Sequence, residues 1–65
     1  MQPHQQRAVD EKTALDEKIA ALSNFIGTNP TFGTLDSAEQ GRLKEQNEIM
    51  LQYSEILGRR IAAFK

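Results

Sequence analysis

The sequence contains no cysteine and a single histidine, His4. Disulfide bonds are therefore excluded, and almost nothing is left with which to build a structural metal site. The chain has only 65 residues, and a single core of this size rarely contributes more than about 3–5 kcal/mol of stability. Chains this short that lack disulfides and metals commonly gain the missing stability by associating. These absences predict one small domain, residues 1–65, that self-associates.

Net positive charge is also missing. The formal charge is −1 at neutral pH, which argues against a dedicated binder of duplex nucleic acid, because such proteins carry excess Lys and Arg. The longest strongly apolar run is Ile19–Leu22, far shorter than the roughly 20 residues of a spanning helix. The opening residues also lack the basic head and apolar stretch of a secretory signal. We therefore expect no membrane association and a cytoplasmic location.

Signatures of catalysis are absent as well. There is no cysteine nucleophile, no Gly-x-Ser-x-Gly, no phosphate-binding glycine loop and no second histidine to pair with His4. The acidic pairs Asp10-Glu11 and Asp16-Glu17 lack the Glu-x-x-His spacing of metal sites in helical bundles, and we interpret them as solvent-facing. The sequence predicts a protein that is not an enzyme and uses no cofactor or metal.

Turn-forming residues are concentrated in one central window, which holds Gly27, Asn29, Pro30 and Gly33. This window divides the chain into two arms. We predict helix 1 over about residues 2–27, a loop over about 28–35 and helix 2 over about 36–64.

The first arm carries an apolar stripe at helical spacing, formed by Ala8, Leu15, Ile19, Leu22 and Ile26. Pro3 suits a first helical turn, because its missing N–H would have no partner there. Gly27 suits the end of the helix, because glycine readily adopts the left-handed conformation that closes many helices.

The second arm begins with a capping pair, either Asp36 with Glu39 or Ser37 with Gln40. Gly41 and Gly58 lie inside the predicted helix and suggest close backbone packing. Its main apolar stripe contains Leu43, Met50, Leu57, Ile61 and Phe64. A second apolar stripe beside it contains Ile49, Tyr53, Ile56 and Ala63.

Two helices joined by a short loop predict an all-α fold, an antiparallel two-helix hairpin. With the turn near Thr31 and Phe32, residues whose numbers add up to about 65 should lie level, which places Leu15 beside Met50. One hairpin covers only the main stripes. The second stripe therefore predicts a homo-oligomeric helical bundle, with a four-helix dimer as the simplest closure and trimers of dimers as a larger one.

Three arginines, Arg7, Arg59 and Arg60, are expected at the open end of the hairpin. Arg59 and Arg60 complement the dipole of helix 2, so a structural role and an anion site both stay open. Like charges gathered by a fold favour an anionic partner. His4 lies one turn before Arg7 and is either a surface residue or a group that contacts a nucleotide base.

Tyr53 is the only tyrosine and belongs to the second stripe. Its ordinary role would be packing. If two copies meet at this stripe, the tyrosines with Lys12 and Asn47 would line a pocket between subunits that is suited to stacking on a purine.

Four segments carry a resemblance to a family of very short phage and prophage proteins: Met1–Lys12, Leu22–Ile26, Asn29–Phe32 and Tyr53–Ile61. This family is similar to a small protein of crAss-like phages and consists of helical hairpins. The resemblance implies an anti-defence role, because several small phage-encoded helical oligomers act as sponges for the nucleotide signals of bacterial immunity.

By this resemblance the chain would act in the host cytoplasm and withhold a cyclic ADP-ribose isomer of Thoeris or a cyclic oligonucleotide of CBASS, without catalysis. Its ligand-binding residues would be Tyr53, Arg60, Arg7, Arg59, Lys12, His4 and Asn47. The main alternative is a module whose second stripe binds a helix of a host or phage protein. A further alternative is a structural or nucleic-acid-associated accessory protein.

Overall fold

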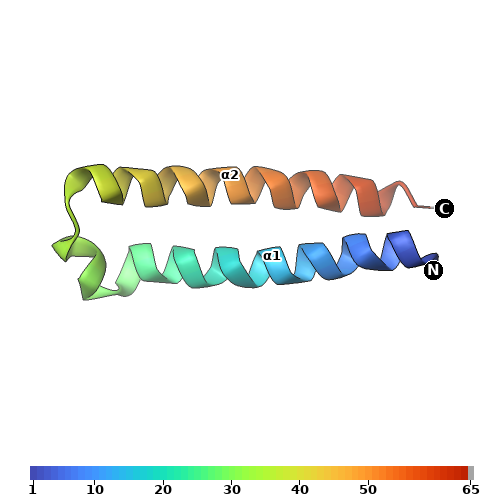
Figure 1. Cartoon of the computed structure of the whole chain (residues 1–65), viewed down its shortest axis with the longest axis horizontal. Coiled ribbons are helices and arrows are strands. Elements are labelled where there is room, and N and C mark those ends of the chain that lie inside the picture. Colours follow the sequence, from blue (N-terminus) through green and yellow to red (C-terminus); the bar gives the residue numbers. More distant parts are fainter. Residues whose placement is uncertain (65) are drawn as a thin grey trace.

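The computed structural model describes residues 1–64 and contains two long helices that run antiparallel. Helix α1 spans Pro3–Thr28, a short 3₁₀ helix η1 spans Pro30–Thr34, and helix α2 spans Ser37–Ala62. Figure 1 shows the resulting hairpin, with both ends of the chain at the end opposite η1. The prediction of an all-α hairpin with its helices packed on each other is confirmed.

Both helices begin at well-formed caps. Pro3 is the first residue of α1, and the side chain of Gln5 accepts a hydrogen bond from the backbone N–H of Gln2 at 2.9 Å. At the start of α2, the Asp36 carboxylate accepts from the backbone N–H of Glu39 at 2.7 Å. Of the two capping pairs that the sequence left open, Asp36 therefore supplies the cap.

The end of α1 differs from the prediction at Gly27. Among residues 1–64 no glycine has a positive φ, and the helix continues through Gly27 to Thr28. The chain leaves the helix at Asn29, which has an extended backbone and whose side chain accepts from the N–H of Thr31. Asn29 therefore ends α1, where the sequence predicted Gly27, and it also caps η1.

The loop is folded rather than irregular. The ring of Phe32 packs edge-on against Phe25 with centroids 6.0 Å apart, and the Lys44 ammonium lies 5.8 Å from the Phe32 centroid. The Gln40 side-chain amide donates to the carbonyls of Phe32 and Leu35 at 3.1 and 2.9 Å. These contacts tie the turn to both helices.

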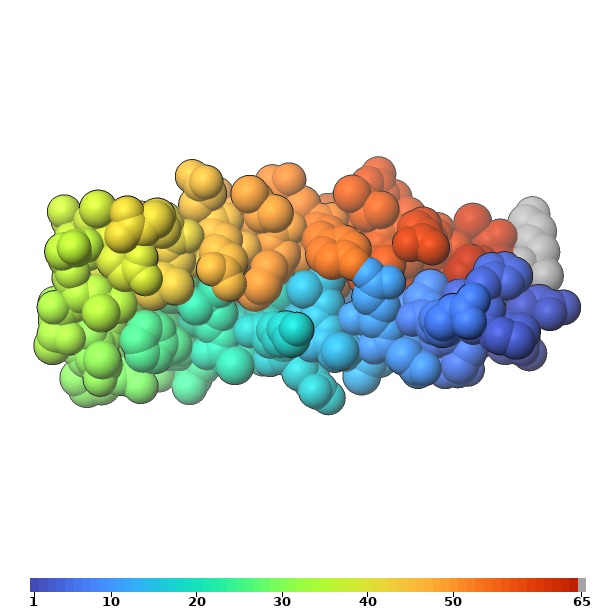
Figure 2. Space-filling model, viewed as in Figure 1, coloured from blue at the N-terminus to red at the C-terminus, as the bar shows by residue number. Residues whose placement is uncertain are grey.

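The core is a narrow seam along the hairpin. Leu15, Ile19 and Leu57 form its buried cluster, and Met50 packs against them. Figure 2 shows the two helices in contact along the length of the molecule. The space-filling body is long and thin, with extents of 47 × 15 × 14 Å.

The helices are level at a different register from the predicted one. Contacting pairs across the seam, such as Ser23 with Asn47 and His4 with Phe64, have numbers that add up to between 66 and 70. The offset arises because η1 extends beyond the end of α1 before the chain crosses over, so α2 starts further along the hairpin than α1 ends (Figure 1).

Candidate ligand-binding site

The predicted site residues lie on different sides of the hairpin. One edge of the helix seam carries the polar contacts of Lys12, Ser54, Ser23 and Asn47. The other edge carries His4 and Phe64, whose rings meet edge to face with centroids 6.4 Å apart. We call the first the polar edge and the second the aromatic edge.

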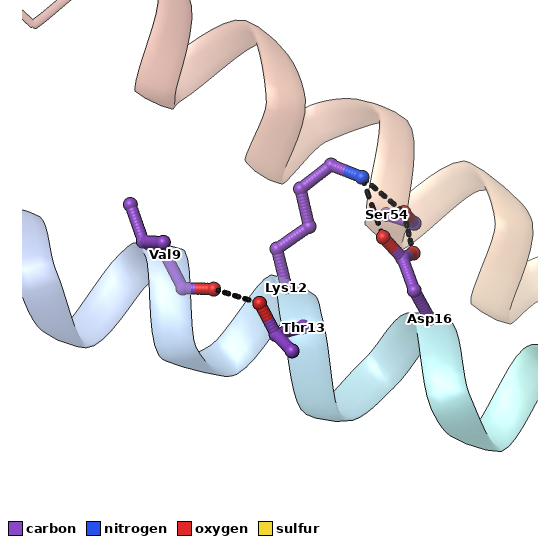
Figure 3. Close-up of polar contacts among 5 residues, drawn as sticks. All are labelled: Val9, Lys12, Thr13, Asp16 and Ser54. Atoms are coloured by element: carbon purple, nitrogen blue, oxygen red, sulfur yellow. Dashed lines mark hydrogen bonds and ion pairs between the residues drawn. The ribbon is translucent and has the colours of Figure 1, made fainter.

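A three-residue network joins the helices at the polar edge (Figure 3). The Lys12 ammonium donates to the carboxylate of Asp16 at 2.8 Å and to the hydroxyl of Ser54 at 3.2 Å. The Ser54 hydroxyl in turn donates to the same carboxylate. Ser54 is buried, and the network gives its hydroxyl two hydrogen-bonding partners on α1.

The network affects the protonation of Asp16. The hydrogen bond from Lys12 lowers the pKa of Asp16 below its usual 3.8, and the bond from Ser54 adds to this effect. An ionised carboxylate next to the ammonium neutralises much of the Lys12 charge. Lys12 is therefore less suited to hold a phosphate than the sequence suggested.

The sequence had a signal for this network that our interpretation missed. Ser54 falls among Met50, Leu57 and Ile61 in the main apolar stripe of α2, and a polar residue in such a stripe usually has a hydrogen-bonding partner. Lys12 and Asp16 are four residues apart and thus neighbours on α1. We had assigned Asp16 to a solvent-facing acidic pair.

Asn47 is likewise engaged at the polar edge. Its amide donates to the Ser23 hydroxyl at 3.1 Å, and the same hydroxyl lies 3.2 Å from its amide oxygen. Tyr53 directly precedes Ser54, so about 100° of helix rotation separates the two side chains. The structure thus places Lys12 and Asn47 at one edge and does not bring them together with Tyr53 on the same hairpin.

Tyr53 lies with its apolar neighbours on the outer side of the aromatic edge. Ile49, Tyr53 and Ile56 are 57%, 42% and 47% exposed. Large apolar side chains gathered at this exposure are typical of an interaction surface. The second stripe is therefore uncovered on the single hairpin, as the sequence predicted.

Two of the three arginines share a side of the molecule with Tyr53. On α2, Arg60 follows Tyr53 by seven residues and precedes Phe64 by four, which puts the three on one side of the helix. On α1, Arg7 lies one turn after His4, which contacts Phe64. Arg59 is about 100° around α2 from Arg60 and points away from this side.

Among residues 1–64 there is no metal-ligand cluster, no pocket and no membrane-spanning helix. No three metal-ligating side chains come together in this part of the chain, and the hairpin that it forms has no pocket. Neither α1 nor α2 has a stretch long and apolar enough to cross a membrane.

The fold and the exposed surface define a class: a small helical hairpin with an exposed aromatic and cationic side. The chain belongs to the Sequestin family, whose model matches residues 2–63. This name is consistent with sequestering a small signal molecule and implies binding rather than catalysis. No curated protein and no solved structure matches the chain.

Proposed function

We propose that this protein is a phage anti-defence sponge that binds and withholds a small nucleotide immune signal. The signal is either a cyclic ADP-ribose isomer of Thoeris or a cyclic oligonucleotide of CBASS, and no catalysis is involved. The protein acts in the host cytoplasm as a homo-oligomer. Membership of the Sequestin family supports a sequestering role.

The observation that carries the proposal is the placement of Tyr53 and Arg60 on one exposed side of α2. Seven residues separate them, which is two helical turns or about 10 Å. A nucleotide presents a flat base and an anionic phosphate at different positions. A tyrosine ring is suited to stacking on the base, and a guanidinium donates paired hydrogen bonds to the phosphate.

The other predicted site residues differ in how directly they would contact the ligand. Arg7 and His4 lie on the same side as Arg60, where Arg7 adds positive charge and His4 adds an imidazole ring. Arg59 contributes positive charge from the neighbouring side of α2. Lys12 and Asn47 keep their bonds within the hairpin and support the seam, so the proposed contacts are Tyr53, Arg60, Arg7 and His4.

The proposal places the ligand between copies of the chain. Small-molecule sites usually enclose most of the ligand surface, and one thin hairpin offers an exposed row of side chains instead. Two copies whose exposed rows face each other would enclose a base between aromatic and apolar side chains. Binding without chemistry needs only such a preorganised pocket.

Calorimetry on the verified oligomer tests the proposal, with a panel of cyclic ADP-ribose isomers, cyclic dinucleotides and cyclic trinucleotides. We expect saturable heat with one class of these compounds. Tyr53→Ala should weaken this binding, because each aromatic stacking contact contributes about 1–3 kcal/mol. Leu51→Ala, an exposed position 49% open to solvent on another side of α2, is the matched control. No heat with any compound would refute the proposal.

A protein-binding module is the alternative that the exposed stripe favours. An amphipathic helix from a host or phage protein would then cover Ile49, Tyr53 and Ile56. Light scattering distinguishes the two. A closed oligomer supports the sponge, whereas a stable monomer with the stripe uncovered supports the module.

A further inference from the structure

The exposed side that bears Tyr53 is formed by two rows of residues, one from each helix, which we call the assembly face. The α2 row follows the alternating four-and-three spacing of a helix-pairing surface and contains Arg42, Gln46, Ile49, Tyr53, Ile56, Arg60 and Ala63. The α1 row has the same spacing and contains Arg7, Glu11, Ala14, Lys18, Ala21 and Phe25. Both rows lie on one side of the hairpin, because His4 beside the first row contacts Phe64 beside the second.

We infer that a second copy of this chain docks on the assembly face, with its α2 antiparallel to the first α2 and the two-fold axis beside Tyr53. The inference deepens the proposed function, on which it rests for the nature of the ligand.

The order of apolar residues along α2 is symmetric about this axis. If the antiparallel pair is centred between Gln52 and Tyr53, Ile49 lies level with Ile56 of the second copy, and the reverse contact is equivalent. The two Tyr53 side chains then lie on either side of the axis. The most exposed apolar side chains of the α2 row thereby cover one another.

The charges around the axis are complementary as well. With the same centre, Glu45 lies level with Arg60 of the second copy. On α1, Glu11 lies within one turn of the level of Lys18 of the second copy. Within the hairpin formed by residues 1–64, the ion pairs are Lys12 with Asp16 and Arg42 with Glu39. The charges available to a second copy are therefore those of Glu11, Lys18, Glu45 and Arg60.

The other face-to-face arrangement is less favourable. A two-fold axis along the length of the hairpin would set α2 against α1 of the second copy. Because the helices are level where residue numbers add up to between 66 and 70, Arg60 would then lie near Arg7 of the second copy. Like charges in contact oppose association, and the antiparallel α2 pair avoids this contact.

The size of the face fits a dimer. Its extents of 47 and 15 Å give a projected area on the order of 700 Å², close to the roughly 800 Å² per partner of a standard stable interface. A second copy that covers both rows along their length therefore buries about the area that a specific dimer needs.

This arrangement completes the site of the proposed function. Two Tyr53 rings, one from each copy, would flank the base near the axis. A guanidinium has five N–H donors, so Arg60 can bond the carboxylate of Glu45 from the second copy and a phosphate together. Glu45 is then a positioning residue, and the site is incomplete in one copy.

Single-cysteine crosslinking tests the geometry, since the chain has no cysteine of its own. Gln52→Cys places a thiol beside the axis and leaves Tyr53 intact. Leu51→Cys is the control, because its thiol lies about 100° around α2 from that of position 52, away from the assembly face. With a short bismaleimide we expect at least about tenfold more covalent dimer from Gln52→Cys. Equal yields, or more dimer from Leu51→Cys, would overturn the inference.

A charge swap provides a second test. Glu45→Arg and Arg60→Glu should each raise the dimer dissociation constant by about tenfold in sedimentation equilibrium, and the double variant should return within about threefold of the wild-type value. Circular dichroism checks that each variant keeps its helices. A double variant that associates no better than the weaker single variant would overturn the predicted pairing.

These outcomes are separable from the proposed function. Crosslinking at Gln52→Cys together with no calorimetric heat from any nucleotide would support the dimer and refute the sponge. Nucleotide binding by a wild-type oligomer that crosslinks through Leu51→Cys would support the sponge and refute this dimer.

Discussion

At the scale of single residues, the most consequential side chain of the seam is a polar one. Ser54 is buried and hydrogen-bonds to Asp16 and Lys12 of the other helix. Hydrogen bonds to charged groups stabilise more than neutral ones. These bonds also have a fixed geometry, which apolar contacts lack. The network therefore holds the register of α1 against α2.

Replacing Ser54 by alanine should lower the free energy of unfolding by about 1–2 kcal/mol, because a buried hydrogen bond to charged partners is lost. Urea denaturation measures this loss. Ser23→Ala is the control, since Ser23 bonds to the neutral Asn47 at an exposed position, and it should cost less. An equal loss in both variants would contradict the special role of the network.

Asp16 should make stability depend on acid pH. Its pKa is lowered in the folded chain, first by the bond from Lys12 and then by that from Ser54. The folded state therefore binds fewer protons than the unfolded state, and the stabilisation is present above about pH 4 and is lost as pH falls through the lowered pKa.

Urea midpoints measured from pH 7 down to pH 2 check this prediction. Asp16→Asn should flatten the acid limb of the curve, because the residue can no longer titrate. Asp10→Asn removes a carboxylate that bonds to Gln6 within α1 and is the matched control. A wild-type slope in Asp16→Asn would count against the prediction.

At the scale of elements, the start of α2 depends on Asp36. Its carboxylate accepts from the backbone N–H of Glu39 at 2.7 Å, and loss of such a cap costs about 1 kcal/mol. Asp36→Ala should therefore lower the unfolding midpoint. Ser37→Ala should change it little, because Ser37 is the first helical residue and does not cap. Similar losses in both variants would mean that the cap is shared.

Gly41 is a position in α2 at which a larger residue should stabilise the helix. A methyl group there would meet nothing within 4 Å, and no glycine among residues 1–64 has a positive φ. Gly41→Ala should raise stability by up to about 1 kcal/mol, since alanine favours the helix over glycine. At Gly58 a methyl group would lie 3.4 Å from the Lys12 side chain, so thermal unfolding should reveal a smaller gain there.

The two helices were predictable because their apolar residues recur at a strong 3.6-residue period and the turn formers are concentrated between them. The register of α1 against α2 was not predictable, because it depends on the path of η1. The sequence prediction had assumed a turn centred on the middle of the loop. The prediction of close backbone packing at Gly41 was also wrong.

The site was predictable only in part. Periodicity assigns Tyr53 to the exposed stripe, whereas the partners of Lys12 and Asn47 depend on which residues of the other helix lie opposite. That pairing depends on the same register.

At the scale of the whole molecule, the hairpin has little interior. Among the described residues, the buried apolar side chains are Ala8, Leu15, Ile19 and Leu57. A body 47 Å long and about 15 Å thick has no room for a second layer of core. The side chains that would form such a layer are on the assembly face, so association and folding should be coupled.

This coupling predicts that stability depends on protein concentration. Because association stabilises only the folded chain, the melting temperature should rise with concentration over the range in which the dimer forms. Ile49→Lys puts a charge into the middle of the assembly face and should make the melting temperature lower and independent of concentration. Leu51→Lys changes another exposed apolar residue, on a different side of α2, and should keep the wild-type dependence. A wild-type melting temperature that stays constant from micromolar to millimolar protein would mean that the hairpin folds alone, and the exposed stripe would then need a different partner.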